Sequence, residues 1–421
     1  MRADSAEREP GSPLRIYLHV GEPKTGSTHL QQVMWRNRAA LATSGITLPG
    51  PRPLAHWRAA MDLREVHQLP NDPIGSYAGA WDRLVRQALR TPKTAVISHE
   101  LFAAVSEEQA RRALSSFGDA EVHVILGVRD FASLIPAEWQ ESVKHRSTRA
   151  WGDWLGDIID READEPDRRQ FWFWRVHDTL EILRIWSQGL PPERVHVLTV
   201  PPRGSAPDLL WRRFAAVVGA DPDSVDLSLA ESKSNASLSV AETELLRQVN
   251  LSMPAELPNW FYMRAVKDRL AAEVLADTPK PERLELPKDR VAWATKESRR
   301  VIAGVRASGV DVAGDLAELA PVKGRTSSRA GSRSPDDLDG EELLRPALAV
   351  ITALLAAEAA ELGIGQTPVA AEPETQSFVK RTLIAASHRS RAVHALRRGY
   401  WNLANAARRR RAPRDRQNEW Q

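Results

Sequence analysis

The sequence predicts an α/β fold, in which helices flank a sheet of parallel strands. Short apolar segments typical of strands alternate along the chain with helical segments of ten or more residues, as in βαβ units. A glycine-bearing turn joins the first strand to the first helix, and charged residues follow two later strands. Ligands of parallel sheets bind beyond the carboxyl ends of the strands, so these residues are expected to share one edge with the turn.

The first strand and helix come near the N-terminus. Apolar and polar residues alternate over Leu14–Val20, which suits a short strand, and Gly21–Pro23 breaks the alternation. A helix is then predicted to begin at Thr25 or Gly26 and to end at Gly45. A strand, a turn and a helix N-terminus in this order direct backbone N–H groups at a phosphate.

Later segments extend the same pattern. The expected strands are Ile46–Leu48, Thr94–Ser98, Glu121–Val128 and Val195–Val200, and the expected helices are Tyr77–Leu89, Ala132–Lys144, Pro207–Val218 and Arg345–Leu362. Between Ser239 and about Leu319 the chain is expected to be wholly helical.

Composition divides the chain into four parts. Residues 1–13 are polar and expected to be disordered, and residues 14–321 are predicted to form the α/β domain. Residues 322–341 are rich in Ser, Arg, Gly and Asp, which predicts a flexible linker. Residues 342–421 are predicted to form a helical, basic C-terminal extension, so that helices are appended to the domain.

Bulk composition limits the functional classes. With 421 residues, 42% of them hydrophobic and 27% charged, the chain can bury the core of a large soluble domain. The absence of cysteine excludes disulfides and thiol chemistry. Residues 1–13 lack the apolar core of a signal peptide, and the longest apolar run, 346–357, is too short to span a bilayer. These features favour a cytoplasmic protein.

Positive charge is concentrated at the C-terminus. Val379–Gln421 holds 12 of the 58 Lys and Arg residues but 2 of the 55 acids, which leaves 46 basic and 53 acidic residues before it. This basic tail suits peripheral contact with an anionic membrane or an acidic partner, and a solvated helix is the open alternative. No specific nucleic-acid partner is predicted.

The turn differs from a Walker A loop. Gly21 and Gly26 have the G-x-x-x-x-G spacing, but Ser27 follows where a Walker A loop has lysine. The lysine, Lys24, lies inside the turn, where it can lean toward the bridging oxygen of a bound 5′-phosphate. That position suits a reaction in which the nucleotide's own 5′-phosphate is the leaving group. An ordinary glycine turn before a helix is the alternative.

The segment Pro23–Thr28 resembles the 5′-phosphosulfate loop of sulfotransferases that use 3′-phosphoadenosine 5′-phosphosulfate (PAPS). The resemblance covers Leu14–Leu30 and Thr94–Lys144, and it implies a P-loop-like sheet and PAPS as co-substrate, with no metal. The acceptor would be a hydroxyl or amine of a carbohydrate, a lipid or a small molecule. The site residues that the resemblance implies are Lys24, Thr25, Gly26, Ser27 and Thr28 for the 5′-phosphate, Arg129 for the 3′-phosphate, Lys24 for the bridging oxygen, and His99 or Glu100 as the base.

Two features of the family are missing. The family has a serine eight residues after the arginine that corresponds to Arg129, and this chain has Ala137 there. An Arg-Lys-Gly loop that also contacts the 3′-phosphate is absent, and Lys233–Asn235 and Val322–Arg325 are the nearest sources of such contacts. A structural salt bridge is therefore an alternative role for Arg129.

Two bases follow the strand Thr94–Ser98. Neighbouring side chains of an extended chain point to opposite sides, so only one of His99 and Glu100 is expected to face the sulfate. An unperturbed histidine pKa of about 6.5 favours His99, whereas the carbohydrate-modifying branch of the family favours Glu100. His56 and His67 are the next candidates.

The segment Trp151–Trp174 holds six aromatic residues around a charged run. These side chains are predicted to form either part of the core or a wall for the acceptor. The sequence contains no Cys and no H-E-x-x-H spacing, so no metal site is predicted.

Two other functions stay open. A kinase or NTPase would need a lysine after Gly26 and a magnesium ligand, for which Asp130 is the candidate. A non-catalytic nucleotide-binding or membrane-docking protein would depend chiefly on the basic tail. The acceptor and the oligomeric state are not predicted.

Overall fold

The computed structural model describes residues 13–69, 75–161, 168–230, 238–254, 256–275, 283–320 and 333–361. The chain consists of two compact units, residues 1–354 and 355–421. In the second unit, the described residues are the last part of helix α14 (Gly340–Glu361). The predicted linker residues 322–332 and the basic tail Val379–Gln421 lie outside the described residues.

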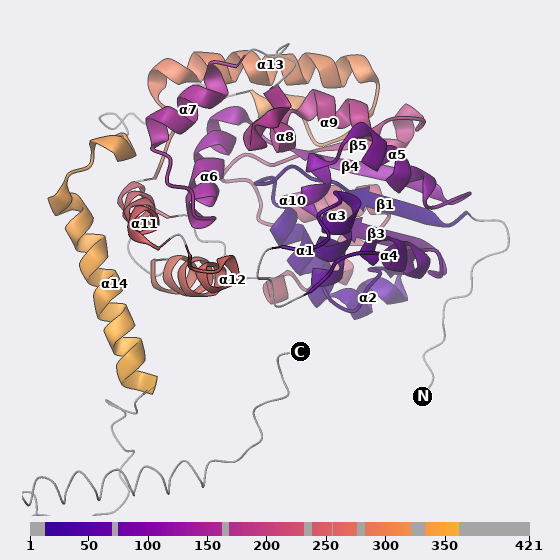
Figure 1. The fold of residues 1–421 in the computed structure, drawn as a ribbon. Coiled ribbons are helices and arrows are strands. Elements are labelled where there is room, and N and C mark those ends of the chain that lie inside the picture. Colours follow the sequence, from indigo (N-terminus) through magenta and orange to yellow (C-terminus); the bar gives the residue numbers. More distant parts are fainter. Residues whose placement is uncertain are drawn as a thin grey trace, which may run out of the picture. The chain divides into compact units, whose positions relative to one another are not determined.

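Six parallel strands form the central sheet of the first unit, in the order β2-β3-β1-β4-β5-β6. The strands are β1 (Arg15–His19), β2 (Ile46–Thr47), β3 (Thr94–Ser98), β4 (Glu121–Val128), β5 (Val195–Thr199) and β6 (Asp311–Ala313). Helices flank this sheet, which confirms the predicted α/β fold class (Figure 1).

The α-helices are α1 (Ser27–Arg36), α2 (Arg38–Thr43), α3 (Leu54–Leu63), α4 (Ala80–Ala88), α5 (Glu107–Ser115), α6 (Phe131–Lys144), α7 (Trp151–Ile159), α8 (Trp172–His177), α9 (Thr179–Trp186), α10 (Leu209–Val218), α11 (Val240–Ser252), α12 (Asn259–Tyr262), α13 (Val291–Ser308) and α14. A π-helix, η7 (Met263–Val274), continues α12. The 3₁₀ segments are η1 (Glu100–Ala104), η2 (Arg168–Gln170), η3 (Pro192–Arg194), η4 (Pro222–Ser224), η5 (Leu227–Ala230), η9 (Lys288–Arg290), η10 (Leu316–Leu319) and η11 (Pro335–Asp337).

Two hydrophobic clusters cover the two faces of the sheet. On one face, α1 and α10 pack apolar side chains against alternate strand residues such as Tyr17, Val96 and Ile125. On the other face, α4, α5, α6, α9 and α13 pack against the intervening residues, such as Leu18 and Val124. The alternation of strand side chains thus gives each face its own core.

The strand order places the loop after β1 at a switch point. Strands β2 and β3 lie on one side of β1, and β4, β5 and β6 lie on the other. The helix after β1 packs on one face of the sheet and the helix after β4 on the opposite face. Ligands of open parallel sheets bind in the crevice at such a point, outside the carboxyl ends of the strands.

Two details of the predicted elements are wrong. The first helix does not continue to Gly45, because Asn37 separates α1 from α2 and its side-chain amide donates to the carbonyl oxygens of Val33 and Asp226. The chain from Ser239 to Leu319 is not wholly helical, because β6 pairs with β5 at the edge of the sheet. A strand of three residues is too short to show alternation in the sequence.

None of the helices in the described part of the chain is both long enough and apolar enough to cross a membrane.

Candidate active site

The turn between β1 and α1 has the geometry of an anion-binding loop. Lys24, with a φ of 63°, and Gly26, with a φ of 85°, adopt left-handed conformations. A Cβ atom at Gly26 would lie 2.4 Å from the end of the Leu210 side chain, which would have to move, and the positive φ by itself favours glycine there. Gly26 is also the N-cap of α1 and has no side chain to bond the first N–H groups of the helix. Those groups and the helix dipole favour an anion at this point.

A cluster of buried polar side chains contacts Glu22 of the loop. The Glu22 carboxylate accepts a hydrogen bond from Thr179 Oγ1 at 2.6 Å and lies 3.4 Å from His177 Nδ1. Glu138 lies 3.5 Å from the other ring nitrogen. Burial alone would lower the pKa of His177, but the adjacent carboxylates of Glu138 and Glu22 raise it to about 9. A charged imidazole between two carboxylates therefore fixes the loop to the end of α8 and to α6, and Thr179 fixes it to the start of α9.

The Thr25 side chain also points toward this buried cluster and away from solvent. It is buried, donates to the Glu22 carbonyl oxygen at 2.5 Å and packs on Gly127 of β4. At Gly127 a Cβ would lie 2.7 Å from the Thr25 hydroxyl oxygen, so this strand must have glycine where the loop crosses it. Thr25 can reach a phosphate only through its backbone N–H.

The loop opens into a cavity of about 1090 Å³, here called the loop cavity. Of the eight predicted site residues, Thr25 does not line it, and the other seven do: Lys24, Gly26, Ser27, Thr28, His99, Glu100 and Arg129. The carboxyl ends of β1, β3 and β4 supply all of them, because these strands are neighbours in the sheet.

Glu141 of α6 holds the lysine of the loop. Lys24 Nζ lies 2.5 Å from Glu141 Oε2, and Lys267 Nζ of η7 lies 3.0 Å from Glu141 Oε1. Burial raises the pKa of Glu141, but the two lysines outweigh it and hold that pKa well below its usual range. The carboxylate is therefore charged and bridges two cations inside the loop cavity.

Arg129 connects the loop to the end of β4. Its Nη1 donates to the Lys24 carbonyl oxygen at 3.1 Å. Burial is the largest cause of its lowered pKa, and the nearby Arg203 lowers that pKa further. In the described residues no acid forms a salt bridge with Arg129 within 4.0 Å.

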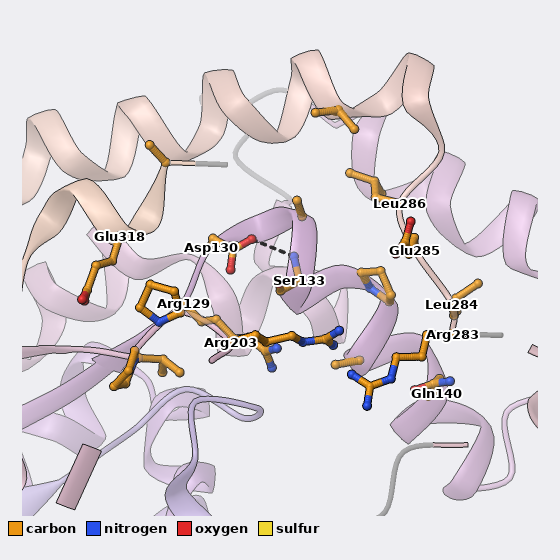
Figure 2. Close-up of a pocket in the computed structure, with 18 of the residues that line it drawn as sticks. Arg129, Asp130, Ser133, Gln140, Arg203, Arg283, Leu284, Glu285, Leu286 and Glu318 are labelled. Carbon is orange, nitrogen blue, oxygen red and sulfur yellow. Dashed lines mark hydrogen bonds between the residues drawn. The ribbon is translucent and has the colours of Figure 1, made fainter. Parts of the chain in front are cut away.

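A second pocket of about 340 Å³, here called the arginine pocket, lies on the other side of Arg129. Arg203, from the segment after β5, and Arg283, from the segment before η9, also line it. Figure 2 shows Arg283 extending toward the side chains of Arg129 and Arg203. The pocket and the loop cavity share Arg129, Ala137 and Gln140, so the two hollows adjoin.

His99 and Glu100 both line the loop cavity, and which of them would face a bound sulfate stays a prediction. The strand ends at Ser98, the backbone of His99 is still extended, and the 3₁₀ segment that His99 caps begins at Glu100. His99 Nδ1 accepts from the Leu101 N–H at 3.1 Å, which places the proton of a neutral ring on Nε2. Glu100 accepts from Gln31 Nε2 at 3.1 Å.

His56 and His67, the next candidates for the base, line neither the loop cavity nor the arginine pocket. His56 is buried, where it bonds the Pro49 carbonyl oxygen and accepts from the Ser98 N–H. Burial lowers its pKa to about 4, so it stays neutral as a structural group. His67 lies 3.2 Å from Asp62, away from the site.

The aromatic side chains of Trp151–Trp174 lie in two places, the hydrophobic core and the wall of the loop cavity. Trp151, Phe173 and Trp174 are buried in the core. Trp172 is 45% exposed and lines the loop cavity, where Trp57 of α3 also lies. One side chain of the cluster thus belongs to the cavity wall, and Trp57 is a wall residue that the sequence analysis did not single out.

The serine that the family would place at position 137 has no direct replacement on α6. Ser133 lines the arginine pocket, and its N–H bonds to Asp130 at 2.8 Å (Figure 2). Ser142 lines the loop cavity and donates to the Trp139 carbonyl oxygen at 2.8 Å. Lys233–Asn235 and Val322–Arg325 lie outside the described residues.

Several site residues were missed from the sequence. Glu138 and Glu141 are acids on one side of an otherwise largely apolar helix, and their spacing of three residues is a signal that could have identified them. Lys267, Arg203 and Arg283 have no local signal, because chain segments far from the loop bring them to the site.

Neither a protein-family model nor a curated protein matches this chain. Among solved structures, the crystal structure of a sulfotransferase from Alicyclobacillus acidocaldarius is similar, with 18% identity and a TM-score of 0.33 over 60% of this chain and 95% of that one. A likeness at this level does not assign the chain to a family.

Proposed function

We propose that this chain is a sulfotransferase that transfers a sulfuryl group from PAPS to a hydroxyl or amine. The observation that carries the proposal is the position of Arg129 between the phosphate-binding turn and the arginine pocket, with its guanidinium bonded to the Lys24 carbonyl. Two adjoining hollows that each hold cationic side chains suit one nucleotide that carries phosphate at both its 5′ and 3′ positions. Three acids, Asp130, Glu285 and Glu318, line the arginine pocket beside its three arginines.

Each hollow would bind one end of the donor. The N–H groups at the start of α1 would hold the 5′-phosphate, and Lys24 would approach its bridging oxygen. Arg129, Arg203 and Arg283 would bind the 3′-phosphate. These additional arginines offer the contacts that Ala137 and the missing Arg-Lys-Gly loop cannot.

The reaction would be a direct displacement. The acceptor oxygen or nitrogen forms a bond to sulfur while the bond from sulfur to the bridging oxygen breaks. The electron pair of that bond stays on the bridging oxygen, which leaves as part of 3′,5′-ADP, and Lys24 stabilises the charge that develops there. The acceptor's proton passes to a base of the site.

We assign the base to Glu100. A neutral His99 carries its proton on Nε2, because Nδ1 accepts the Leu101 N–H, and so presents no lone pair there. Burial raises the pKa of Glu100, but the adjacent His99 ring and hydrogen bonds, one of them from Gln31, outweigh it and lower that pKa below its usual value. Glu100 is then ionised and can accept a proton, with His99 beside it.

The aromatic wall indicates where the acceptor would enter. Trp57 and Trp172 line the same cavity as Glu100. Aromatic faces stack on sugar rings and on other flat apolar groups, so a cyclic acceptor could rest there with a hydroxyl toward the base.

The position of Asp130 gives little support to the alternative function, that of a kinase or NTPase. This acid accepts the Ser133 N–H as the N-cap of α6, and it lines the arginine pocket rather than the loop cavity. Among the residues that the structure describes, no three His, Cys, Asp or Glu side chains are grouped to hold a metal ion.

Transfer of label from PAPS is the test of this function. The protein would be incubated with PAPS labelled at sulfur and with separate carbohydrate, lipid and small-molecule fractions as acceptors. We expect label to appear in one acceptor fraction together with equimolar 3′,5′-ADP, and the Lys24→Ala variant to give far less. Release of phosphate from ATP by the parent, with no label transferred from PAPS, would favour the rival enzyme class.

A further inference from the structure

Lys267 and Lys24 contact the two oxygens of the same carboxylate, that of Glu141. Lys24 Nζ contacts Glu141 Oε2 at 2.5 Å, and Lys267 Nζ contacts Glu141 Oε1 at 3.0 Å and His145 Nε2 at 2.8 Å. The side chains of Lys24 and Lys267 are 26% and 27% exposed, and both line the loop cavity. Two cations are therefore held side by side at the mouth of the phosphate-binding turn.

The two lysines come from unrelated parts of the chain. Lys24 belongs to the turn after β1, whereas Lys267 belongs to η7, a helix of π type that contacts α6. Single turns of π-helix inside α-helices are frequent at functional sites, and η7 is a longer segment of this type. If the ion pair between Lys267 and Glu141 only joined η7 to α6, the second oxygen of Glu141 would not need to hold Lys24 as well.

The charge of the donor extends beyond its 5′-phosphate. The sulfuryl group carries further oxygens that share negative charge, and Lys24 lies on the side of the bridging oxygen. We infer that Lys267 binds the non-bridging oxygens of the sulfuryl group and that Glu141 positions both lysines for the donor. This inference rests on the proposed sulfotransferase function and adds a donor-binding residue to it.

Binding of two related nucleotides separates this role from a structural one. PAPS carries the sulfuryl group and 3′,5′-ADP does not, so a contact with that group affects the first ligand alone. For Lys267→Ala we expect Kd for PAPS to rise roughly tenfold to a hundredfold, as for loss of a charge-assisted hydrogen bond, with Kd for 3′,5′-ADP within about twofold of the parent. Calorimetric titration without acceptor measures both constants.

Two further variants control the experiment. Lys267→Arg keeps the positive charge and is expected to retain most of the preference for PAPS. Lys288→Ala removes an exposed lysine of η9 that lines neither hollow, and it should leave both constants unchanged. If Lys267→Ala weakens both ligands equally, or neither, Lys267 does not bind the sulfuryl group. If the parent itself binds neither nucleotide, the proposed function fails, and this inference fails with it.

Discussion

Lys24 occupies a left-handed position inside the turn, and its ammonium rests on Glu141. If it stabilises the leaving oxygen, its contribution is made mainly in the transition state. Lys24→Ala should therefore lower kcat far more than it weakens binding of 3′,5′-ADP. Steady-state kinetics with PAPS and separate titration of 3′,5′-ADP would measure the two effects. Unchanged turnover in the variant would remove the role assigned to Lys24.

The base is tested by a pair of single variants, Glu100→Gln and His99→Ala. Loss of a positioned base costs roughly 10²–10⁴-fold in rate, so Glu100→Gln should lower kcat at least a hundredfold while 3′,5′-ADP still binds. His99→Ala should have the smaller effect on kcat. This effect would arise because loss of the His99 side chain disturbs Glu100 and the η1 segment that His99 caps. The reverse order of effects would assign the base to His99, and near-parental turnover in both would place it elsewhere.

At the level of residues, the sequence predicted the groups that are adjacent to a recognisable strand or loop. Lys24, Arg129, His99 and Glu100 each follow a strand end, and strands β1, β3 and β4 proved to be neighbours. Trp57, Lys267, Arg203 and Arg283 could not be predicted in this way, because their place in the site depends on how distant segments pack. The roles of all these residues stay predictions.

At the level of elements, the buried Glu22–His177–Glu138 cluster joins the loop to the end of α8 and to α6. The pKa of His177 is raised to about 9, above its ordinary value near 6.5, so protonation of His177 stabilises the fold. Burial also raises the pKa of Glu22, which acts in the same direction. The contribution of His177 is fully present below about pH 6.5 and is lost as the pH rises through about 9, whereas that of Glu22 begins to be lost above its ordinary pKa of 4.5.

Urea unfolding of the parent and of His177→Gln, followed between pH 6 and pH 10, would test this cluster. We expect the parent's unfolding midpoint to fall as the pH rises through that range. The variant should be less stable by about 3–5 kcal/mol near pH 7, because two carboxylates lose their buried partner, and it should lose much of the pH dependence. A variant with the parent's stability and pH profile would show that the cluster does not hold the loop.

The elements themselves were largely predictable, because alternation and helical spacing are strong over β1, β3, β4 and β5. Boundaries failed where a side chain competes with the helix, as Asn37 does between α1 and α2. Strand β6 has three residues and could be recognised only through its pairing with β5. The order of the sheet follows from tertiary packing and cannot be deduced from any single segment.

At the level of the whole molecule, we predict that the basic tail Val379–Gln421 is dispensable for chemistry. The tail lies outside the described residues, and every lining residue of the loop cavity precedes it in the sequence. Truncation before Val379 should leave kinetics with a soluble acceptor unchanged and should lower binding to vesicles that contain anionic lipid. Loss of 3′,5′-ADP binding on truncation would place the tail in the active site.

Nucleotide selectivity tests the central claim most directly. Thermal unfolding of the parent and of Arg129→Ala would be compared in buffer and with 3′,5′-ADP, AMP and ATP·Mg²⁺. At a hundred times its Kd a ligand adds roughly 2.7 kcal/mol to the free energy of unfolding. We predict that 3′,5′-ADP stabilises the parent more than AMP or ATP·Mg²⁺ does. Arg129→Ala should lose about 1.5–3 kcal/mol of binding free energy for 3′,5′-ADP and with it much of the preference over AMP. Stabilisation of the parent by ATP·Mg²⁺ and not by 3′,5′-ADP would contradict the account.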